Sequence, residues 1–473
     1  MKTVLMLAAV VLLYATPLLA NEEIIVGGQD QQAVNLTIYT RNLALVKDRR
    51  TIDLPQGAHT LAFREVSAQI KPETAVMEGR DIRVLEQNFE YDLLTPQSLL
   101  QKYVGREVTL RKQHSVSGEE RSVQAKVLSA GDGVVLRVGN QIETEINGRL
   151  VFPDVPDTLR DRPTLTMQVE SGAAGAREVE LTYLTTGLSW RADYVAELNA
   201  ADDRLDLSGW VTLINESGAR YPQARLQLVA GDVNVAPRPM PVQMREMEVL
   251  AMAPGPKTMG EEPIFDYHLY SLERPTTIGE NQKKQVALLK ASGVTCRKEY
   301  LLRGQEHYYR SRIGEIGQKM KVGVFVEMRN DKESGGAGLA LPGGVVRVYK
   351  KDSGGSLQFV GEDMINHTPE KELVRLRLGD AFDITADKTQ TDFKQLKGPE
   401  SAGVQYESEY AIRLKNAKKE AVVVKVQEPI PGEWQILRES GKHIKESARL
   451  VSWLVTVPPM DSATLTYRVS IRN

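Results

Sequence analysis

The clearest pattern in the chain is an alternation of apolar and polar residues over residues 179–239. A period of two gives an extended segment one buried face and one wet face, so this stretch predicts four half-buried strands. Turn-forming residues separate the strands at 186–187, 199–203 and 215–218. We expect an antiparallel meander that forms the central framework of the protein. The alternating apolar residues are Val179, Leu181, Tyr183, Trp190, Ala192, Tyr194, Ala196, Leu198, Leu205, Leu207, Val211, Leu213, Leu226 and Leu228.

Shorter alternating runs before and after this stretch predict a protein built mainly of β-strands. We expect several β-sandwich domains of the immunoglobulin or fibronectin kind, although the Cys…Trp…Cys pattern of antibody domains is absent. We also expect one small SH3-like barrel near the N-terminus. The expected units are a signal peptide at 1–20, an N-terminal β-domain at 21–92, a short helix plus the barrel at 93–156, a central sandwich at 157–236, a flexible connector at 237–263, a second sandwich region at 264–398 and an immunoglobulin-like domain at 399–473.

The expected barrel segment begins with a short helix. Thr95 caps this helix, Pro96 takes its first position and Gly105 follows its end. Residues 106–152 then contain four or five short strands, which is typical of an SH3-like barrel. Some barrels of this kind bind peptides or nucleic acid and many are spacers. We favour the spacer.

Residues 1–20 have the features of a secretory signal peptide, because Lys2 is followed by an apolar run of suitable length. We expect cleavage before Asn21. The alternative is an uncleaved anchor helix, but a bilayer span needs about 20 apolar residues. No later stretch is long and apolar enough to span a bilayer, so we expect a periplasmic or secreted protein of the cell envelope without a transmembrane segment.

Charge and cysteine content narrow the range of partners. Lys and Arg (60) nearly balance Asp and Glu (62), which argues against nucleic acid or an anionic membrane as a partner. Cys296 is the single cysteine, so no disulfide can form within the chain. A reactive thiol is one interpretation of Cys296, and we favour a small buried residue.

Several separated segments form a recognisable series along the chain. They are YLTTGLSWRADY (183–194), WVTLINESG (210–218), LQLVAGDVNVAP (226–237), FDYHLYSLERPTTIGENQKKQVALL (265–289), LPGGVVRVYKKD (341–352), FVGED (359–363) and LRLGDAFDI (376–384). Together they resemble the family of the domain of unknown function 4139, from about Leu181 to the C-terminus. That family includes exported bacterial proteins, some labelled mucoidy-inhibitor-like, and no catalytic residues are established for it. The resemblance therefore implies a fold and an exported location rather than an activity.

Residues 237–263 differ abruptly in composition from their surroundings. They contain six prolines and no sustained apolar period, which predicts a flexible connector. The connector also has five methionines, at 240, 244, 247, 252 and 259. Thioethers are soft ligands for copper(I), so a copper site is an alternative. We favour a loop of biased composition without bound metal.

Candidate metal-binding and catalytic residues are scattered. The six histidines are each more than ten residues apart, so no paired zinc ligands can be read. Two groups of acidic residues have no calcium-loop spacing, and although alternating carboxylates on a strand would suit a glycosidase, we expect solvated turn charges. The groups are Asp380, Asp383, Asp387 and Asp392, and Asp202, Asp203 and Asp206. We therefore assign no catalytic residue, cofactor or metal.

Residues 265–289, after the connector, are rich in apolar side chains. We expect this segment to pair with or lie across the central strands, with residues 286–289 starting the next strand. Tyr267, His268 and Tyr270 form a candidate surface for a partner. The alternative is that all three side chains simply pack on the sheet.

Two functional hypotheses follow from the sequence. The first is a non-enzymatic binding or structural module of the cell envelope, whose partner is an envelope protein or a polysaccharide. The second is a carbohydrate-active hydrolase with acids from separate strands or loops and tryptophans such as Trp190, Trp210, Trp434 or Trp453 as sugar platforms. We favour the first, because residues on a buried sheet face explain the tryptophans equally well. A pocket holding two carboxylates within about 10 Å, as in glycosidases, would favour the second.

Overall fold

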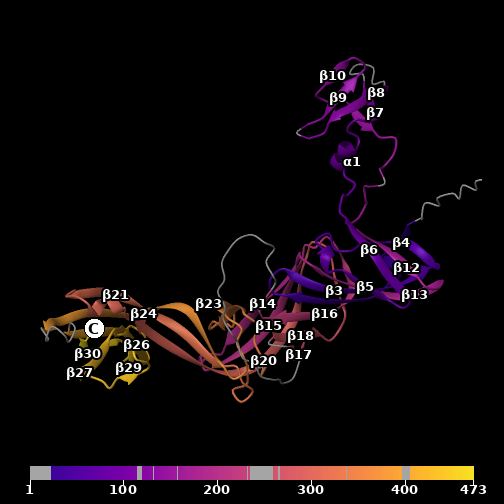
Figure 1. Ribbon diagram of the computed structural model, residues 1–473. Helices are drawn as coiled ribbons and strands as arrows, with labels where there is room; N and C mark the ends of the chain where they lie inside the picture. Colours follow the sequence, from indigo (N-terminus) through magenta and orange to yellow (C-terminus); the bar gives the residue numbers. More distant parts are fainter. Residues whose placement is uncertain are drawn as a thin grey trace, which may run out of the picture.

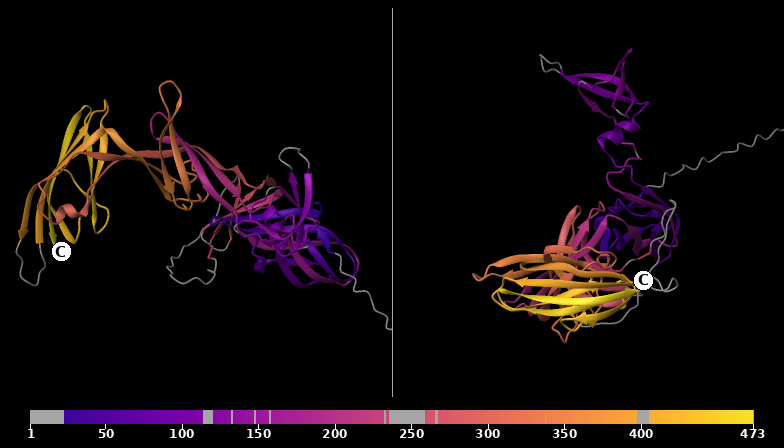
Figure 2. Two further views of the ribbon diagram at one scale, coloured as in Figure 1. Left: turned by 90° about the horizontal axis from the view of Figure 1, so that it is seen from above. Right: turned by 90° about the vertical axis from the view of Figure 1, so that its left-hand side faces the viewer.

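The protein is an elongated assembly of β-sheets. The described residues form thirty strands, one α-helix and three short 3-10 helices, which confirms the prediction of a mainly β protein. Figure 1 shows a body near the N-terminus, a small lobe that stands away from it, and a C-terminal lobe at the opposite end. Figure 2 shows the same extended arrangement from two other sides. The computed structural model describes residues 23–472, with gaps at 114–119, 132, 147, 157, 232, 235–258, 265–266, 337 and 397–404.

The N-terminal body contains two sheets. The smaller sheet has the order β1 (Ile24–Val26), β4 (Gly57–Arg64), β12 (Thr164–Ser171), β6 (Ile82–Glu90). The larger has the order β17 (Met259–Ile264), β18 (Tyr267–Leu272), β16 (Tyr221–Ala230), β2 (Gln31–Tyr39), β3 (Leu43–Leu54), β13 (Gly175–Thr185), β5 (Val76–Gly79), and β19 (Thr276–Ile278) also pairs with β16. Two 3-10 helices, η1 (Gly28–Asp30) and η2 (Pro72–Thr74), lie in its loops.

A third sheet runs from the middle of the molecule into the C-terminal lobe. Its order is β23 (Leu357–Ile365), β22 (Gly344–Lys351), β14 (Leu188–Leu198), β15 (Arg204–Asn215), β20 (Gln282–Arg303), β21 (Glu315–Arg329), β24 (Leu373–Leu396), β25 (Gln405–Asn416), β30 (Asp461–Arg472), β27 (Glu433–Glu439). Beside this path, β26 (Val422–Pro429) pairs with β20 and β29 (Leu450–Val457), and β28 (Ile444–Lys445) pairs with β29. The 3-10 helix η3 (Glu306–Tyr309) follows β20.

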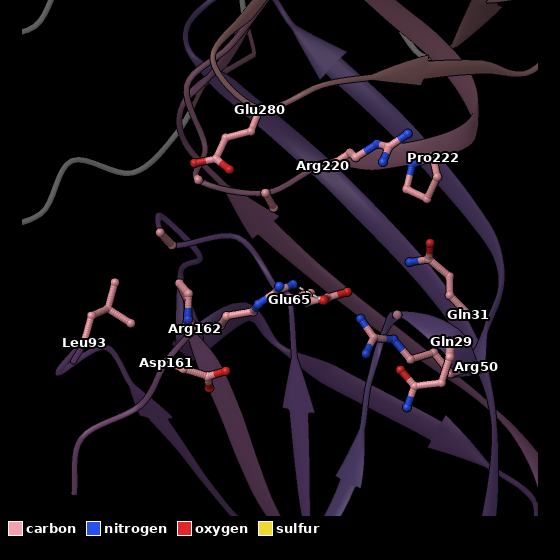
Figure 3. Close-up of a pocket in the computed structure, with 15 residues that line it drawn as sticks. Gln29, Gln31, Arg50, Glu65, Leu93, Asp161, Arg162, Arg220, Pro222 and Glu280 are labelled. Atoms are coloured by element: carbon pink, nitrogen blue, oxygen red, sulfur yellow. Dashed lines mark hydrogen bonds and ion pairs between the residues drawn. The ribbon is translucent and has the colours of Figure 1, made fainter. Parts of the chain in front are cut away.

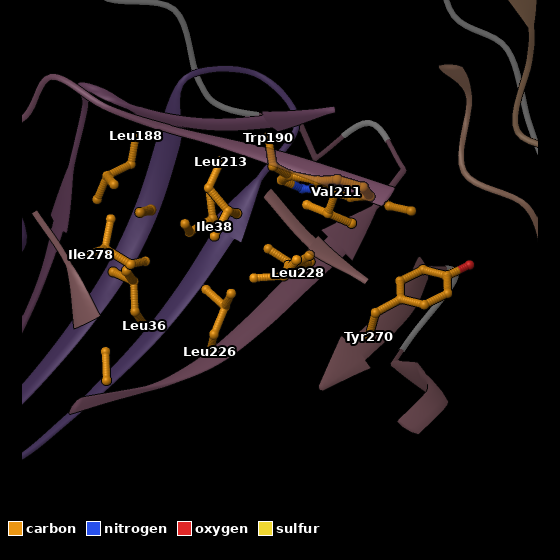
Figure 4. Packing of buried hydrophobic residues seen from close by; sticks show 14 of the residues in the cluster. Leu36, Ile38, Leu188, Trp190, Val211, Leu213, Leu226, Leu228, Tyr270 and Ile278 are labelled. Carbon is orange, nitrogen blue, oxygen red and sulfur yellow. The ribbon is translucent and has the colours of Figure 1, made fainter. Parts of the chain in front are cut away.

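The four strands predicted from the alternating pattern are present as β13 to β16, but they do not form a meander. Only β14 and β15 pair with each other, whereas β13 pairs with β3 and β5, and β16 pairs with β2 and β18. The outer two strands, β13 and β16, therefore belong to one sheet, and β14 and β15 belong to another. Figure 4 shows the consequence, because apolar side chains from β14 and β15 meet those of β2 and β16 in one core. The predicted alternation of buried and exposed residues is confirmed, but the buried residues belong to two sheets that face each other.

Three long strands connect separate hydrophobic cores. On β20, residues from Val286 to Cys296 lie in the first core, and Tyr300 and Leu302 lie in the core of the C-terminal lobe. β21 and β24 behave in the same way and contribute residues to both cores. The segment 264–398, expected as one unit, therefore contributes to two cores. The domain boundaries themselves stay predictions.

The small lobe has its own core around α1 (Pro96–Lys102). The predicted helix is confirmed: Thr95 Oγ1 accepts a hydrogen bond from the Ser98 backbone at 3.0 Å, and Pro96 is the first helical residue. Its strands form one sheet, and within the described residues this sheet does not close into the expected SH3-like barrel. The order is β10 (Gln141–Glu143), β9 (Val135–Val138), β8 (Glu120–Ser129), β7 (Glu107–Gln113), β11 (Arg149–Val151). The edge strands β10 and β11 are only three residues long, and no pairing joins them within the described residues.

The expected connector 237–263 overlaps a strand at its C-terminal end. Residues 235–258 lie outside the described part of the chain, but Met259–Ile264 form β17, which pairs with β18. Pro263 is compatible with this strand because β17 lies at the edge of its sheet. Residues 259–263, expected to be flexible, therefore belong to a strand, and the bounds of the connector stay a prediction.

The segment after the connector is docked, as predicted. β18 pairs with β16, and β20 pairs with β15, so both flank the central strands. The next strand begins at Gln282, a little before the expected residues 286–289. Residues 1–22, with the expected signal peptide, lie outside the described range, and no helix in the described ranges is long and apolar enough to cross a membrane.

Candidate functional site

The best candidate site is a cavity of about 750 Å³ in the N-terminal body. The loops after β1, β4 and β6 meet there with the segment before β12, the turn between β15 and β16, and the turn that precedes β20 (Figure 3). Its lining residues are Gly28, Gln29, Gln31, Arg50, Glu65, Ala68, Leu93, Asp161, Arg162, Pro163, Gly218, Ala219, Arg220, Pro222 and Glu280. These residues come from several separate segments of the sequence, so the cavity forms only when the chain folds.

The turn at 215–218, which the sequence predicted, forms one wall of the cavity. The Ala68 backbone N–H and the Ser67 hydroxyl both donate to the Ser217 carbonyl at 2.9 Å, which fixes this turn to the loop after β4. Gly218 has a φ of +76°, and a β-carbon there would lie 2.6 Å from Ala68 Cβ. Only glycine combines this backbone conformation with so close an approach. The wall is therefore held in a single position.

A buried ion pair forms the floor of the cavity. The Arg50 side chain is almost fully buried, and it donates to Asp48 Oδ2 from Nε at 3.1 Å and from Nη2 at 2.7 Å. Its Nη1 donates to the carbonyls of Val26 at 2.7 Å and Arg64 at 3.0 Å, and Gln31 donates to the other Asp48 oxygen at 2.9 Å. A buried ion pair is tolerated when further hydrogen bonds satisfy it, as they do here. Arg50 therefore has a structural role in the cavity.

Two further ion pairs lie on one side of the cavity, Arg162 with Glu65 and Arg64 with Asp161. Glu65 has a φ of +62°, in the left-handed region that residues other than glycine seldom adopt. A β-carbon at Gly28 would lie 2.2 Å from Glu65 Oε2, so this carboxylate rests directly against the Gly28 backbone. Strained backbone of this kind persists where the surroundings enforce it and is common at functional sites.

Arg220 and Glu280 line the cavity from the β15–β16 turn and the β19–β20 turn. Both residues are exposed, and within the described part of the chain neither side chain has an ion-pair or hydrogen-bond partner. Figure 3 shows them on the side away from the Arg162–Glu65 pair. The cavity thus offers one guanidinium and one carboxylate that no other described side chain compensates.

The lining residues suit binding of a charged, polar group. Guanidinium groups donate in a fixed fork to carboxylates, and Glu280 can accept from an ammonium or guanidinium group. The three lining carboxylates are Glu65, Asp161 and Glu280, and Glu65 and Asp161 already accept hydrogen bonds from arginines. None of the described residues that line the cavity has an aromatic side chain that could serve as a platform for a sugar ring.

The residues predicted as a partner surface lie elsewhere, on β18. Tyr270 belongs to the first core, and its hydroxyl donates to the Ala340 carbonyl at 2.9 Å. Tyr267 and His268 are half-buried, and a β-carbon at Gly231 would lie 2.5 Å from the Tyr267 ring. Tyr270 therefore packs inside the protein. A partner surface at Tyr267 and His268 stays a prediction.

The expectation of solvated turn charges is confirmed for only part of the two acidic groups. Asp202 and Asp203 lie in the turn between β14 and β15, and the exposed side chains are those of Asp203, Asp206, Asp380 and Asp383. Asp380, Asp383, Asp387 and Asp392 all lie within β24, where Asp387 pairs with Lys415 at 2.5 Å and Asp392 pairs with Arg468 at 2.6 Å. Asp202 pairs with Lys298 at 2.8 Å and with Lys350. Burial alone would raise the pKa of Asp202, but hydrogen bonds from these two lysines lower it below its ordinary value. Asp202, Asp387 and Asp392 therefore each form ion pairs with side chains on other strands.

Cys296 is buried and unpaired, as predicted. Burial raises the pKa of its thiol to about 11. Among the described residues, no group of three or more His, Cys, Asp or Glu side chains is placed to hold a metal ion. Four of the five connector methionines, and His114, lie outside the described ranges.

Sequence reasoning missed the cavity because its residues come from separate segments and match no motif. The one signal was indirect: Gly218 and Glu280 lie in two of the segments that carried the resemblance noted above. A family model described as "Domain of unknown function (DUF4139)" matches residues 179–473. No curated protein matches the chain. The matched region supplies Arg220 and Glu280, and the part before residue 179 supplies Glu65, Asp161 and Arg162.

Proposed function

This chain belongs to the DUF4139 family, and we propose that it is an exported, non-enzymatic binding module of the cell envelope. In this proposal the cavity receives a charged segment of an envelope protein. Arg220 binds an acidic side chain of that segment, and Glu280 binds a basic one. The remaining sheets position the cavity and connect it to the C-terminal lobe.

The uncompensated charges of Arg220 and Glu280 carry this proposal. Opposite charges across an interface steer association and select partners, whereas charges already paired within one protein contribute little to recognition. The paired side of the cavity supports the geometry, because Arg50, Arg162 and their carboxylates hold the loops in place. The lack of aromatic side chains in the lining favours a protein segment over a sugar chain.

Two observations support export. Lys2 and the apolar run after it resemble a signal peptide. The first strand in the described part of the chain begins at Ile24, close to the expected mature start at Asn21. Arg160 binds both oxygens of Glu23 at 2.8 Å, which anchors the chain close to that start. A chain cleaved before Asn21 would therefore keep its first strand.

Affinity purification from envelope extracts tests the proposal. The protein, the charge-reversal variants Arg220→Glu and Glu280→Lys, and the control Arg83→Glu would each be used as bait, with mass spectrometry of the retained proteins. Arg83 is an exposed arginine on β6, outside this cavity. We expect one partner to be retained by the unchanged protein and the control and lost from both cavity variants. Equal retention by all four baits would contradict a role for the cavity.

A second candidate function is carbohydrate hydrolysis. It is favoured by one observation, that Glu65, Asp161 and Glu280 line the same cavity, since most glycosidases use two carboxyl groups. The pairing of Glu65 and Asp161 with arginines opposes it, because one carboxyl group must be free to give up a proton. Release of reducing ends from envelope polysaccharide by the protein, but not by Glu280→Gln, would support hydrolysis.

A further inference from the structure

A buried lysine and a buried glutamate face each other in the core of the C-terminal lobe. Lys388 lies on β24 and is 1% exposed, and Glu428 lies on β26 and is fully buried. The Lys388 Nζ donates to Glu428 Oε1 at 2.6 Å. Removing two charges from water is costly, and the interior of a protein recovers that cost only with excellent geometry. None of the proposals above uses this pair.

Tyrosines surround the pair. Tyr309 donates its hydroxyl to Glu428 Oε2 at 2.9 Å and lies 2.7 Å from the Tyr467 hydroxyl. The Lys388 Nζ lies 4.7 Å from the centre of the Tyr308 ring and 5.1 Å from that of Tyr410. The amine therefore contacts aromatic faces on one side and a single carboxylate on the other.

The backbone also leaves room for this carboxylate. A β-carbon at Gly304 would lie 1.9 Å from Glu428 Oε2, so any larger residue at position 304 would displace it. Oε2 is held between this glycine and the Tyr309 hydroxyl, while Oε1 receives the lysine. The Lys388 amine and the Glu428 carboxylate are thus fixed in one orientation.

The pair connects two groups of strands in the C-terminal lobe. β24 pairs with β21 and β25, whereas β26 pairs with β20 and β29. Antibody domains join their two sheets at the core with a disulfide that packs on a tryptophan. In this lobe Trp453 stacks on Tyr467, with ring centres 4.6 Å apart, and the single cysteine of the chain lies in the other core. A different covalent link would serve the same purpose here.

We propose that Lys388 and Glu428 condense to an intramolecular amide that joins β24 to β26. A proton passes from Nζ to Oε1 along their hydrogen bond, and the neutral amine attacks Cδ of Glu428. The Tyr309 hydroxyl stabilises the negative charge that forms on Oε2. A second proton moves from the nitrogen to Oε1, the C–Oε1 bond breaks, and Oε1 leaves as water. One C–N bond replaces one C–O bond, and the reaction needs no oxidant or other reactant.

The surroundings favour this reaction. Burial lowers the pKa of Lys388, against the opposing effect of Glu428, and so favours the neutral amine that the attack requires. Reacting groups held in contact react as though present at very high concentration. The amide also replaces two buried charges with a neutral group, which removes their desolvation cost.

Mass spectrometry of the purified protein tests the proposal. The amide makes the chain lighter by one water, and trypsin cannot cut after Lys388 once its amine is acylated. We expect a branched peptide in which residues 378–394 are joined to residues 426–438. Free peptides 378–388 and 426–438, with no loss of mass, would overturn the proposal. This measurement uses the unchanged protein, so it does not depend on whether a variant folds.

Two variants and one control locate the reaction. Lys388→Met should have the full mass expected from its sequence, and Tyr309→Phe should show a smaller branched fraction because it lacks the donor to Oε2. Lys425 and Glu446 form a matched control in the same lobe, with Nζ and Oε1 2.5 Å apart but both side chains partly exposed. We expect trypsin to cut normally after Lys425. A branched peptide at the control pair would show that burial is not the cause and would overturn the proposal.

Discussion

Gly187 lies directly against Ser217, because a β-carbon at position 187 would be 2.6 Å from the Ser217 Cα atom. Gly187 also has a φ of +81° and forms the turn between β13 and β14. The Glu216 backbone N–H donates to the Gly187 carbonyl at 2.6 Å. This contact fixes the point at which the chain leaves one sheet for the other, and it supports the wall of the cavity.

Replacing Gly187 with alanine should destabilise the protein by about 2–4 kcal/mol, since strain from the left-handed conformation adds to a backbone clash. Gly293 provides the matched control, because its φ of +69° is similar but a β-carbon there would meet open space. Gly293→Ala should cost only about 1 kcal/mol. Urea unfolding of both variants measures the difference. Equal losses would show that the contact with Ser217 is unimportant.

The strands around the Gly187 turn show what could be predicted from the sequence and what could not. The alternation at 188–198 and 205–213 and the turn residues at 199–203 predicted β14, β15 and their connection correctly. Alternation identifies which face of a strand is buried, but it does not identify the neighbouring strand. Thr185 on β13 lies opposite Ala44 on β3, a pairing between distant parts of the chain that no local pattern contains. The predicted meander failed for this reason.

The cavity could not be predicted for a related reason. Glu65 owes its position to an unusual backbone angle, and Arg220 and Glu280 are distinctive only because no side chain in the described ranges pairs with them. Neither property is visible in a sequence. The buried lysine at position 388 likewise looks like any other charged residue on an alternating strand until the fold places it opposite Glu428.

The buried ion pair beneath the cavity should be essential for stability. Asp48→Ala removes one partner and leaves the Arg50 charge buried without compensation, which should cost about 3–5 kcal/mol. Glu170→Ala breaks the exposed pair of Arg83 and Glu170 and should cost no more than about 1 kcal/mol. Chemical unfolding distinguishes the two. A small loss for Asp48→Ala would mean that water reaches Arg50.

Acid should destabilise the C-terminal lobe through the carboxylates around Arg468. Hydrogen bonds from arginines hold the pKa values of Asp392 and Glu409 below their ordinary values. Groups with a lowered pKa in the folded state stabilise it above their ordinary pKa, about pH 4, and lose that effect as the pH falls through the lowered value. Arg468→Gln should therefore lower the melting temperature at pH 7 more than at pH 3. An equal decrease at both pH values would contradict this explanation.

The Cys296 thiol should be unreactive in the folded protein. Burial raises its pKa to about 11, so very little thiolate is present at pH 8, and the thiolate is the reactive form. A disulfide reagent such as Ellman's reagent should react slowly with the native protein and fully once the protein is unfolded in urea. Rapid reaction of the native protein would show that the thiol is accessible.

The most direct test of the proposed function places a photo-crosslinking amino acid at position 220 or 280 of the protein in living cells. Position 83 serves as the control, because it is exposed and lies outside the cavity. We predict that irradiation joins the same envelope protein to positions 220 and 280 and not to position 83. No protein adduct at either cavity position, or the same adducts at all three positions, would contradict the claim that this cavity binds a partner.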